Sequence, residues 1–504
     1  MNYLNSLLPY VRSGTTEGDG RFLADVFVSS DQLADFYAVE PGSMRVLIGN
    51  KGSGKSAIAE WIHKTSMRRK IPSLLLRPDD LVDTGQPSSL DMSTLKAYYY
   101  EKLLRSVCAQ VGSQINSKLP LVGAAARLYV EARQAGLAKD DFMTKSLELL
   151  SAIAVPAGGV NGKELASDIA GKNAPAQLIR ALNTQLLQGT SKVFYLLIDD
   201  TDQIALPTES AQLNRIWALI LATRKIAMSC NHVRPIVTLR SSVWARLIME
   251  DSAQRDQFDH IRPLVNSLQS DDSHIEQVVY RRLYAASRDC GAQKNRPYEN
   301  FFSGDSVLLP GSAETRTWSS FIVKSSRERP RDALQLVKSM IEAADEERHS
   351  LIGSKDSEKA MRSYSKERVD DVVAEYSLDC KAIRAVIDSF SHVAFEMGFE
   401  EIRDHLLKVP SSTSINIRGY VIKPQEDDGF IRILGLLHEA GFVNPRMPDA
   451  AAPRKFRHLN YSDEAAFIRE DNWNTLQAAR WEVHPAFRSY LLSLKEARDR
   501  RKHT

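Results

Sequence analysis

The feature that most constrains this chain is the stretch at residues 46–62, VLIGNKGSGKSAIAEWI, where a glycine-rich loop separates an apolar run from an amphipathic stretch. The pattern GxxxxGK(S/T) is satisfied in full by Gly49, Asn50, Lys51, Gly52, Ser53, Gly54, Lys55 and Ser56. Glycines let backbone N–H groups turn inward toward an anion, and the N-terminus of a following helix adds partial positive charge. The pattern therefore predicts a strand, a phosphate-binding loop and a helix in succession.

The same loop predicts how a nucleotide would be held. In such a loop the lysine, here Lys55, reaches the β- and γ-phosphates, and the hydroxyl of Ser56 coordinates Mg²⁺. The alternative is a chance glycine turn before a helix, and the expected strand–loop–helix setting argues against it. Residues 49–56 are therefore the predicted nucleotide-binding residues.

A second apolar run, KVFYLLIDDTDQI at residues 192–204, ends in aspartates. This pattern is typical of a buried parallel strand that delivers carboxylates at its C-terminal edge. A phosphate-loop site needs such a strand to bring an acid to the metal. Asp199 is the predicted metal-side carboxylate. One of Asp200 and Asp202 is expected to polarise the attacking water, and Asp200 is preferred.

The sequence also favours one nucleotide over others. A GTPase would carry an NKxD-type guanine reader after a later strand, whereas the NKGS at residues 50–53 lies inside the phosphate loop and lacks the aspartate. No LSGGQ-like stretch is present, which disfavours an ABC ATPase, and the length of the chain disfavours a short nucleotide kinase. ATP is therefore the predicted nucleotide.

Strand-like and helix-like segments alternate around these motifs, which predicts an α/β fold with a parallel sheet and right-handed crossovers. Long helical patterns at about 90–190, broken only by PAGGVNG at 156–162, predict a helical insertion. Near the end, a helix, a glycine and two strands predict a winged-helix-like domain. The expected divisions are an N-terminal lead-in (1–40), a P-loop core (41–270), a helical lid (271–360) and the winged-helix-like domain (365–495).

Composition places limits on the compartment and partners. Four cysteines lie scattered without CxxC spacing, which excludes a standard zinc module and fits a reducing compartment. No stretch approaches the ~18 consecutive apolar residues of a membrane span, and the opening MNYLNSLLPYVRSG is a poor signal peptide. A cytoplasmic protein without a membrane partner is expected. The formal net charge of +3 is close to neutral, so the chain as a whole has no strong positive potential that would attract nucleic acid. Any DNA contact would need a local basic patch.

Two arginine signals join the loop and the acidic strand end. Arg240 follows an apolar run in IVTLRSSVW, and Arg329 and Arg331 flank a proline in SSRERPRDALQLVKSMI. Together with IGNKGSGKSA and IDDTD, these segments resemble a bacterial P-loop ATPase family of the AAA+/STAND type, related to origin-recognition-like ATPases. YSKERVDDVVAEYS and WEVHPAF look like further landmarks, so the resemblance runs from about residue 20 to 490 and leaves out the insertion.

The resemblance implies roles for these arginines. Arg331 would contact the γ-phosphate and couple hydrolysis to movement of the helical lid, with Arg329 as the alternative. Arg240 would read the γ-phosphate from the core strand. The chain departs from the usual AAA+ pattern by carrying an aspartate where the second acid is normally glutamate, which puts the rate of turnover in doubt.

The resemblance also implies partners. AAA+ proteins commonly use an arginine finger from a neighbouring subunit, so a homo-oligomer is expected. Arg255 and Arg262 are candidates for the finger, although an ordinary surface role explains both. A basic patch with interleaved Phe456 and His458 could bind DNA or an effector protein, and acidic EDNW and QEDD segments flank it. Its basic residues are Arg446, Arg454, Lys455 and Arg457.

Three functions remain open from the sequence. The first is a Mg²⁺-dependent ATPase that acts as a molecular switch or machine, in a bacterial defence or mobile-element setting that the resemblance alone suggests. The second is a nucleotide-gated scaffold with little turnover. The third is a DNA loader or translocase. A phosphotransferase is least favoured because no acceptor pocket can be identified.

Overall fold

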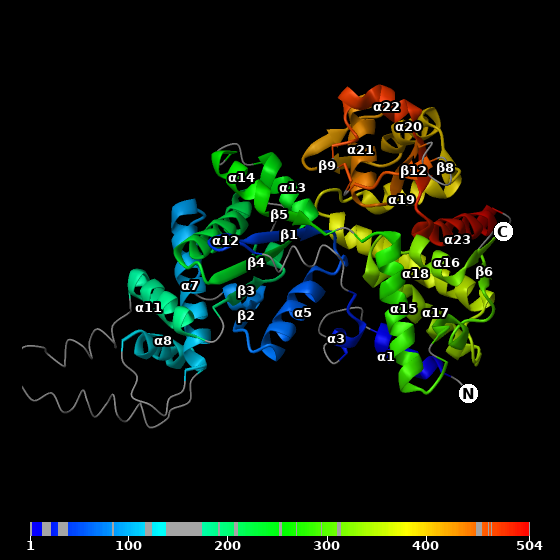
Figure 1. Ribbon diagram of the computed structural model, residues 1–504. Coiled ribbons are helices and arrows are strands. Elements are labelled where there is room, and N and C mark those ends of the chain that lie inside the picture. The colour runs from blue at the N-terminus through cyan, green and yellow to red at the C-terminus, as the bar shows by residue number, and fades with distance from the viewer. Residues whose placement is uncertain are drawn as a thin grey trace, which may run out of the picture. The chain divides into compact units, whose positions relative to one another are not determined.

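The computed structural model describes residues 3–12, 22–28, 39–82, 85–115, 123–137, 174–189, 192–205, 210–250, 255–268, 270–293, 295–309, 314–449, 456–461, 463–464 and 466–502. The chain forms two compact units. The core unit comprises Ser29–Gly49 and Lys55–Leu268. The C-terminal unit comprises Met1–Val28, Asn50–Gly54 and Gln269–Thr504. Figure 1 labels their helices and strands.

The core unit is built on a five-stranded parallel sheet with the order β2-β3-β4-β1-β5. All five residues of β3 are buried, which is why this strand is a continuous apolar run rather than an alternating one. The predicted parallel sheet is confirmed, and β5 is a strand that the sequence analysis did not expect. The strands are β1 (Arg45–Gly49), β2 (Ser73–Leu76), β3 (Phe194–Ile198), β4 (Val233–Arg240) and β5 (Val265–Ser267).

The helices of the core unit follow from this strand order. The chain passes from β1 to the edge strand β2, and each later connection runs across the sheet in the opposite direction. Right-handed crossovers therefore place α5 on one face of the sheet and α7, α12 and α13 on the other (Figure 1). The helices are α5 (Lys55–Arg68), α6 (Pro78–Leu81), α7 (Met92–Ser113), α8 (Gly123–Gln134), α11 (Pro175–Gln188), η1 (Thr201–Ile204), α12 (Ser210–Ser229), α13 (Ser241–Glu250), α14 (Arg255–Ile261) and η2 (Arg262–Leu264).

The insertion between β2 and β3 is helical where the structure describes it. Helix α7 packs against α12 and α8, and α11 packs against both α7 and α8. Close approach of α7 and α8 requires Gly112, because a Cβ there would lie 1.9 Å from the backbone oxygen of Leu128. The expected flexible break at 156–162 lies outside the described residues.

The C-terminal unit begins with residues that the sequence analysis assigned to a lead-in. Helix α1 packs against α15 and α17, and Figure 1 shows it beside α15 despite their separation in sequence. Leu4, Leu7 and Val11 of α1 are buried in the core of this unit. The described residues up to Val28 are therefore part of the C-terminal unit, because most of their buried apolar side chains belong to its core. Its first elements are α1 (Leu4–Val11), α3 (Leu23–Val26), α15 (Asp272–Asp289), η3 (Pro297–Asn300), β6 (Ser306–Leu308), β7 (Thr315–Thr317), α16 (Trp318–Lys324) and α17 (Pro330–Glu346).

The expected boundary between lid and winged-helix-like domain, at 360–365, needs correction. It falls inside α18 (Ser354–Tyr376), a helix that packs against α17 of the lid and against the terminal helix α23. This helix joins the two segments, and their buried apolar side chains belong to one core. The later helices are α18, α19 (Ile383–Ser389), η4 (Phe390–His392), α20 (Phe399–Lys408), η5 (Val409–Ser411), α21 (Asp427–Glu439), η6 (Glu470–Asn472), α22 (Trp473–Ala478) and α23 (Pro485–Lys502).

A four-stranded antiparallel sheet with the order β12-β11-β13-β8 lies in the last third of the chain. The expected sequence of helix, glycine and strands is present: α21 ends before Gly441, whose φ of 66° favours glycine, and β11 follows. A winged-helix assignment stays a prediction. The strands of this part are β8 (Glu396–Met397), β9 (Ile415–Ile417), β10 (Tyr420–Ile422), β11 (Val443–Pro448), β12 (Phe456–His458) and β13 (Arg480–Val483).

Two expectations from composition can be compared with the structure. Among the described residues, no helix combines the length and apolar character needed to cross a bilayer. All four cysteines are free thiols.

Two helical glycines make a matched stability test. We expect Gly112→Ala to lower the free energy of unfolding by about 1–3 kcal/mol, because the new methyl group meets the backbone of α8. Gly435→Ala in α21 should instead be neutral or stabilising by about 0.5–1 kcal/mol, because its nearest neighbouring atom is 3.9 Å from the new Cβ. Denaturant unfolding of both variants measures the difference. Equal changes in the two variants would contradict the close packing at Gly112.

Candidate functional site

The phosphate-loop pattern lies at the junction that the sequence predicts. Strand β1 ends at Gly49 and helix α5 begins at Lys55. Gly52 and Gly54 have φ values of 82° and 101°, a region that residues with a Cβ rarely occupy. This loop precedes the first turn of α5, whose N–H groups have no intrahelical acceptor. The segment thus has the backbone form of an anion-binding nest.

The remaining loop residues have modest exposure. Ser53 is buried and its N–H donates to the carbonyl of Asn50 at 3.2 Å. Within the described residues, the Ser53 hydroxyl has no hydrogen-bond partner. Ser56 lies in the first turn of α5, and it is half-buried, as are Asn50 and Lys51. Ser56 is therefore placed as the sequence predicts, near the start of the helix that follows the loop.

Lys55 is a buried cation at the loop. Its Nζ donates to the carbonyl oxygen of Gly49 at 2.8 Å. Burial lowers the pKa of Lys55 to about 8, and the nearby carboxylates, first among them Asp202, oppose this change. An anion placed in the loop would favour the charged form, so this lysine is suited to hold a phosphate.

The acidic end of β3 is also partly desolvated. Asp199 is buried, and its Oδ1 accepts a hydrogen bond from the hydroxyl of Thr238 at 2.6 Å. Asp200 has a φ of 48°, in the left-handed region, and its N–H donates to the Thr238 hydroxyl at 3.0 Å. Burial raises the pKa of Asp200 to about 6, and the charges of Asp199 and Asp202 add to the rise. A carboxylate of this kind can accept a proton near neutral pH.

Asp202 is already engaged with Arg240. The Nε of Arg240 lies 2.8 Å from Oδ2 of Asp202, which is 4% exposed. Arg240 ends β4 and is paired in register with Gly49, so strand pairing brings the arginine to the phosphate loop. Asp202 thus balances the arginine, and the preference for Asp200 as the base stays a prediction.

The helix that carries the predicted second sensor begins at Pro330, and Arg329 is its N-cap. The N–H of Arg331 lies 3.5 Å from the carbonyl oxygen of Gly52, and a Cβ on Gly52 would lie 3.3 Å from that of Arg331. The structure therefore brings Arg331 beside the loop. The guanidinium of the alternative, Arg329, is 7% exposed and lies 3.5 Å from Glu375 of α18.

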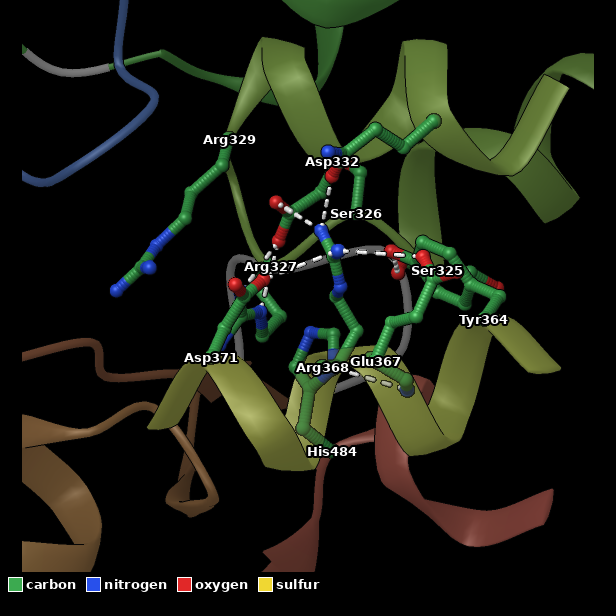
Figure 2. A network of polar contacts seen from close by, with 12 residues as sticks. Ser325, Ser326, Arg327, Arg329, Asp332, Tyr364, Glu367, Arg368, Asp371 and His484 are labelled. Atoms are coloured by element: carbon green, nitrogen blue, oxygen red, sulfur yellow. Dashed lines mark hydrogen bonds and ion pairs between the residues drawn. The ribbon is translucent and has the colours of Figure 1, made fainter. Parts of the chain in front are cut away.

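A buried polar network, shown in Figure 2, holds the start of this helix. Asp332 accepts hydrogen bonds from Arg327 and Arg368 at 2.8 Å each. Burial alone would raise the pKa of Asp332, but the two guanidinium groups outweigh it and hold the pKa below its usual value. Arg368 also pairs with Asp371 at 3.0 Å. The sequence analysis missed this network, and its signal was the landmark YSKERVDDVVAEYS, which contains Arg368.

The turn before the helix is strained. Arg327 and Glu328 have φ values of 49° and 55°, which residues with a side chain adopt at a cost. Arg327 stacks over the ring of Phe487 in α23, and Glu328 accepts a hydrogen bond from Asn460. The turn is thus held from both the lid and the last third of the C-terminal unit. Strain that surrounding contacts maintain in this way is common at functional sites.

The predicted basic patch is neutralised in part among the residues that the structure describes. Arg446 stacks on Phe456 at 3.7 Å from the ring centre and pairs with Glu396 at 2.7 Å. His458 pairs with Glu482 at 2.7 Å, while Arg457 is exposed. Neighbouring glutamates of the sheet therefore balance Arg446 and His458, and a role of the patch in binding DNA or an effector protein stays a prediction. Arg454 and Lys455 lie outside the described residues.

The other candidate groups are less defined. Arg262 is exposed in η2, and Arg255 begins α14, so the identity of an arginine finger stays a prediction. The part of the chain that the structure describes holds no cluster of three or more His, Cys, Asp or Glu side chains arranged for a metal. The hydroxyl of Ser56 and the carboxylate of Asp199 nevertheless offer the oxygen ligands that suit Mg²⁺, which usually binds one or two carboxylates together with substrate phosphates.

Comparison with known proteins gives one domain-level match. The family described as the FunZ-associated C-terminal helical domain matches residues 273–373. This range runs from α15 into α18 and includes α17, the helix of the predicted second sensor.

Among curated proteins, the chain is similar to the putative transposon gamma-delta 80.3 kDa protein of Escherichia coli (strain K12). The two are 23% identical over 405 residues, which cover 76% of this chain and 54% of that protein. The chain thus spans about half the length of this curated relative.

Among solved structures, the chain is similar to the Aeropyrum pernix ORC2 protein in its ADPNP-ADP complexes, with a TM-score of 0.37, 9% identity, and coverage of 96% of this chain and 95% of that one. It is also similar to Cdc6p from Pyrobaculum aerophilum, with a TM-score of 0.32, 12% identity, and coverage of 95% and 94%. Both likenesses are remote and carry no functional conclusion for this chain.

Removing the buried acid of the network should be costly. We expect Asp332→Ala to lower the free energy of unfolding by about 3–5 kcal/mol, because it leaves the buried guanidinium groups of Arg327 and Arg368 without their shared partner. Asp345→Ala, at an exposed position of the same helix, should change it by less than about 0.5 kcal/mol. Denaturant unfolding compares the two variants. Similar small changes in both would contradict a stabilising role for the network.

Glu328 should make stability depend on pH. Burial raises the pKa of Glu328 to about 7, from an ordinary value of 4.5, and Asp463 and Asp272 add to the rise. The folded state therefore favours the neutral carboxyl, and this contribution to stability, complete below 4.5, is lost as the pH rises through about 7.

We therefore expect Glu328→Gln, which is neutral at every pH, to raise the melting temperature more at about pH 8 than at about pH 5. Thermal unfolding at the two pH values measures this. The control is Glu358→Gln, an exposed carboxylate of α18, which should show no such difference. A pH-independent effect of Glu328→Gln would show that the carboxyl is not held neutral.

Proposed function

We propose that this protein is a Mg²⁺-dependent ATPase of the AAA+ type, in which hydrolysis acts as a switch on the C-terminal unit. The observation that carries the proposal is the convergence of the glycine loop, the buried Lys55 and the three aspartates after β3 at one edge of the parallel sheet. Ligands of open parallel sheets bind outside the carboxyl ends of the strands, at the point where the strand order reverses. Here β1 lies at that point, between β4 and β5.

The residues suggest a division of labour during hydrolysis. Loop N–H groups and Lys55 would bind the β- and γ-phosphates, and Ser56 and Asp199 would hold the metal. Mg²⁺, when bound, would screen the phosphate charge. Asp200 would accept a proton from the attacking water as its oxygen bonds to the γ-phosphorus and the bond to the ADP oxygen breaks.

The two arginines from the resemblance fit different tasks. Arg240, held by Asp202 at the end of β4, would sense the γ-phosphate from the sheet. Arg331, beside Gly52 and at the start of α17, would report the nucleotide state to the lid. Arg329 is the weaker alternative because Glu375 already engages it. The strained turn before α17 would pass this state on, since it contacts α23 through Arg327 and Phe487.

The setting and the partners are part of the proposal. A cytoplasmic homo-oligomer that responds to DNA or to an effector protein is consistent with the resemblance to AAA+ and STAND ATPases. The match to a transposon-encoded protein is consistent with a mobile-element or defence setting. A nucleotide-gated scaffold with slow turnover is the second candidate, and the aspartate in place of the usual second glutamate favours it. A DNA loader is less supported, because glutamates neutralise part of the basic patch.

Steady-state hydrolysis and binding of a fluorescent ATP analogue by the purified full chain test the proposal. We expect Lys55→Ala to weaken nucleotide binding by at least about tenfold, because the phosphates lose their buried cation. Asp200→Asn should bind the analogue normally and lower turnover by about 10²–10⁴-fold, as expected for loss of a general base. Lys64→Ala, on the surface of the same helix, is the matched control and should match the wild type.

The outcome separates the candidate functions. Unchanged binding in Lys55→Ala would contradict the ATPase and the scaffold alike. Tight binding with negligible turnover would favour the scaffold. Turnover that single- or double-stranded DNA raises several-fold would favour a DNA-coupled loader.

A further inference from the structure

One side chain outside the sequence motifs holds the acidic end of β3. Thr238 of β4 is 1% exposed and lies two residues before Arg240. Its hydroxyl donates to Oδ1 of Asp199 at 2.6 Å and accepts the N–H of Asp200 at 3.0 Å. Its carbonyl oxygen accepts the hydroxyl of Thr201 at 2.6 Å. Three consecutive residues after β3 are thus bonded to one residue of the neighbouring strand.

The chemistry of a hydroxyl fixes the direction of these bonds. A threonine hydroxyl has one proton and two lone pairs. The proton goes to the Asp199 carboxylate, which can only accept when ionised, and a lone pair receives the amide of Asp200. Thr238 therefore occupies one lone pair on Oδ1 of Asp199 and fixes the plane of this carboxylate, whose remaining lone pairs could face a metal.

The hydrogen bond from the Asp200 N–H to the Thr238 hydroxyl has a second consequence. Asp200 stands in a left-handed conformation that residues with a Cβ avoid, and such conformations persist when surrounding contacts hold them. The hydrogen bond from the Asp200 N–H to Thr238 is a partly buried contact that favours this conformation. The direction in which the Asp200 side chain leaves the backbone depends on it.

We propose that Thr238 is a positioning residue for hydrolysis, which orients the carboxylates of Asp199 and Asp200 relative to each other. The proposal rests on the ATPase function proposed above. Thr238 would act through the two acids, because its hydroxyl bonds to both of them. Its loss should disturb use of the metal and turnover, and leave metal-free binding of nucleotide in the loop intact.

Three variants test this in the full chain. Thr238→Val keeps the shape and removes the hydroxyl, whereas Thr238→Ser keeps the hydroxyl. Thr223→Val removes an equally buried hydroxyl in α12, which donates to the carbonyl of Leu219 at 2.7 Å. Turnover is measured against Mg²⁺ concentration, binding of a fluorescent ATP analogue is measured in EDTA, and the melting temperature is recorded for each variant.

We expect Thr238→Val to lower kcat by at least about tenfold and to raise the half-saturating Mg²⁺ concentration several-fold, because small misplacements of catalytic groups are costly. Binding in EDTA should stay within about twofold of the wild type, since the loop is unchanged. Thr238→Ser should recover most of the kcat and the normal Mg²⁺ requirement. Thr223→Val should change neither of them. Should Thr238→Val not fold, Thr238→Ala carries the same expectations.

Other results would overturn the inference. Normal kcat and Mg²⁺ requirement in Thr238→Val, alongside an inactive Lys55→Ala, would reject the role of Thr238 and leave the ATPase function standing. Equal losses in Thr238→Val and Thr223→Val would show a merely structural role. If the wild type binds ATP without hydrolysing it, the ATPase function fails. The positioning role of Thr238 is then tested by the gain in ATP affinity on adding Mg²⁺. A smaller gain in Thr238→Val than in the wild type supports the positioning role, and an equal gain rejects it.

Discussion

The candidate site depends on the parallel pairing of β4 with β1 on one side and β3 on the other. Pairing with β1 sets Arg240 opposite Gly49, at the start of the phosphate loop. Pairing with β3 brings Thr238 to the aspartates that follow Ile198. Since the backbone bonds of parallel strands fix the register, the loop, the acids and the arginine meet at one edge without any sequence proximity.

Burial turns this meeting into an electrostatic problem. Lys55, Asp199 and Asp202 are each largely removed from water, and an isolated buried charge is costly. Opposite charges at close range offset this cost, since Lys55 and Arg240 lie near the three aspartates. The balance is incomplete, as the lowered pKa of Lys55 and the raised pKa of Asp200 indicate. Perturbed groups gathered in this way are typical of sites that bind charged ligands.

Buried charges are also paired with one another at the start of α17 in the C-terminal unit. Asp332 lies between Arg327 and Arg368, so the strained turn at residues 327–328 is fixed by buried charge pairs. The same turn contacts Asn460 and Phe487, far along the chain. These contacts link the start of α17 to the last third of the unit. Such a link is what a nucleotide switch would need to act on that part of the chain.

The sequence by itself determined the phosphate loop, the buried strand before the aspartates and the parallel α/β core, because each is encoded in a local pattern of glycines or apolar residues. It also placed Ser56 and Lys55 at the start of a helix. Tertiary structure alone decided that Asp202 engages Arg240, that Thr238 holds both acids, that α1 joins the C-terminal unit and that α18 runs through an expected domain boundary. These features depend on strand order and on helix packing between segments distant in sequence, and no local pattern records which distant segment a side chain will meet.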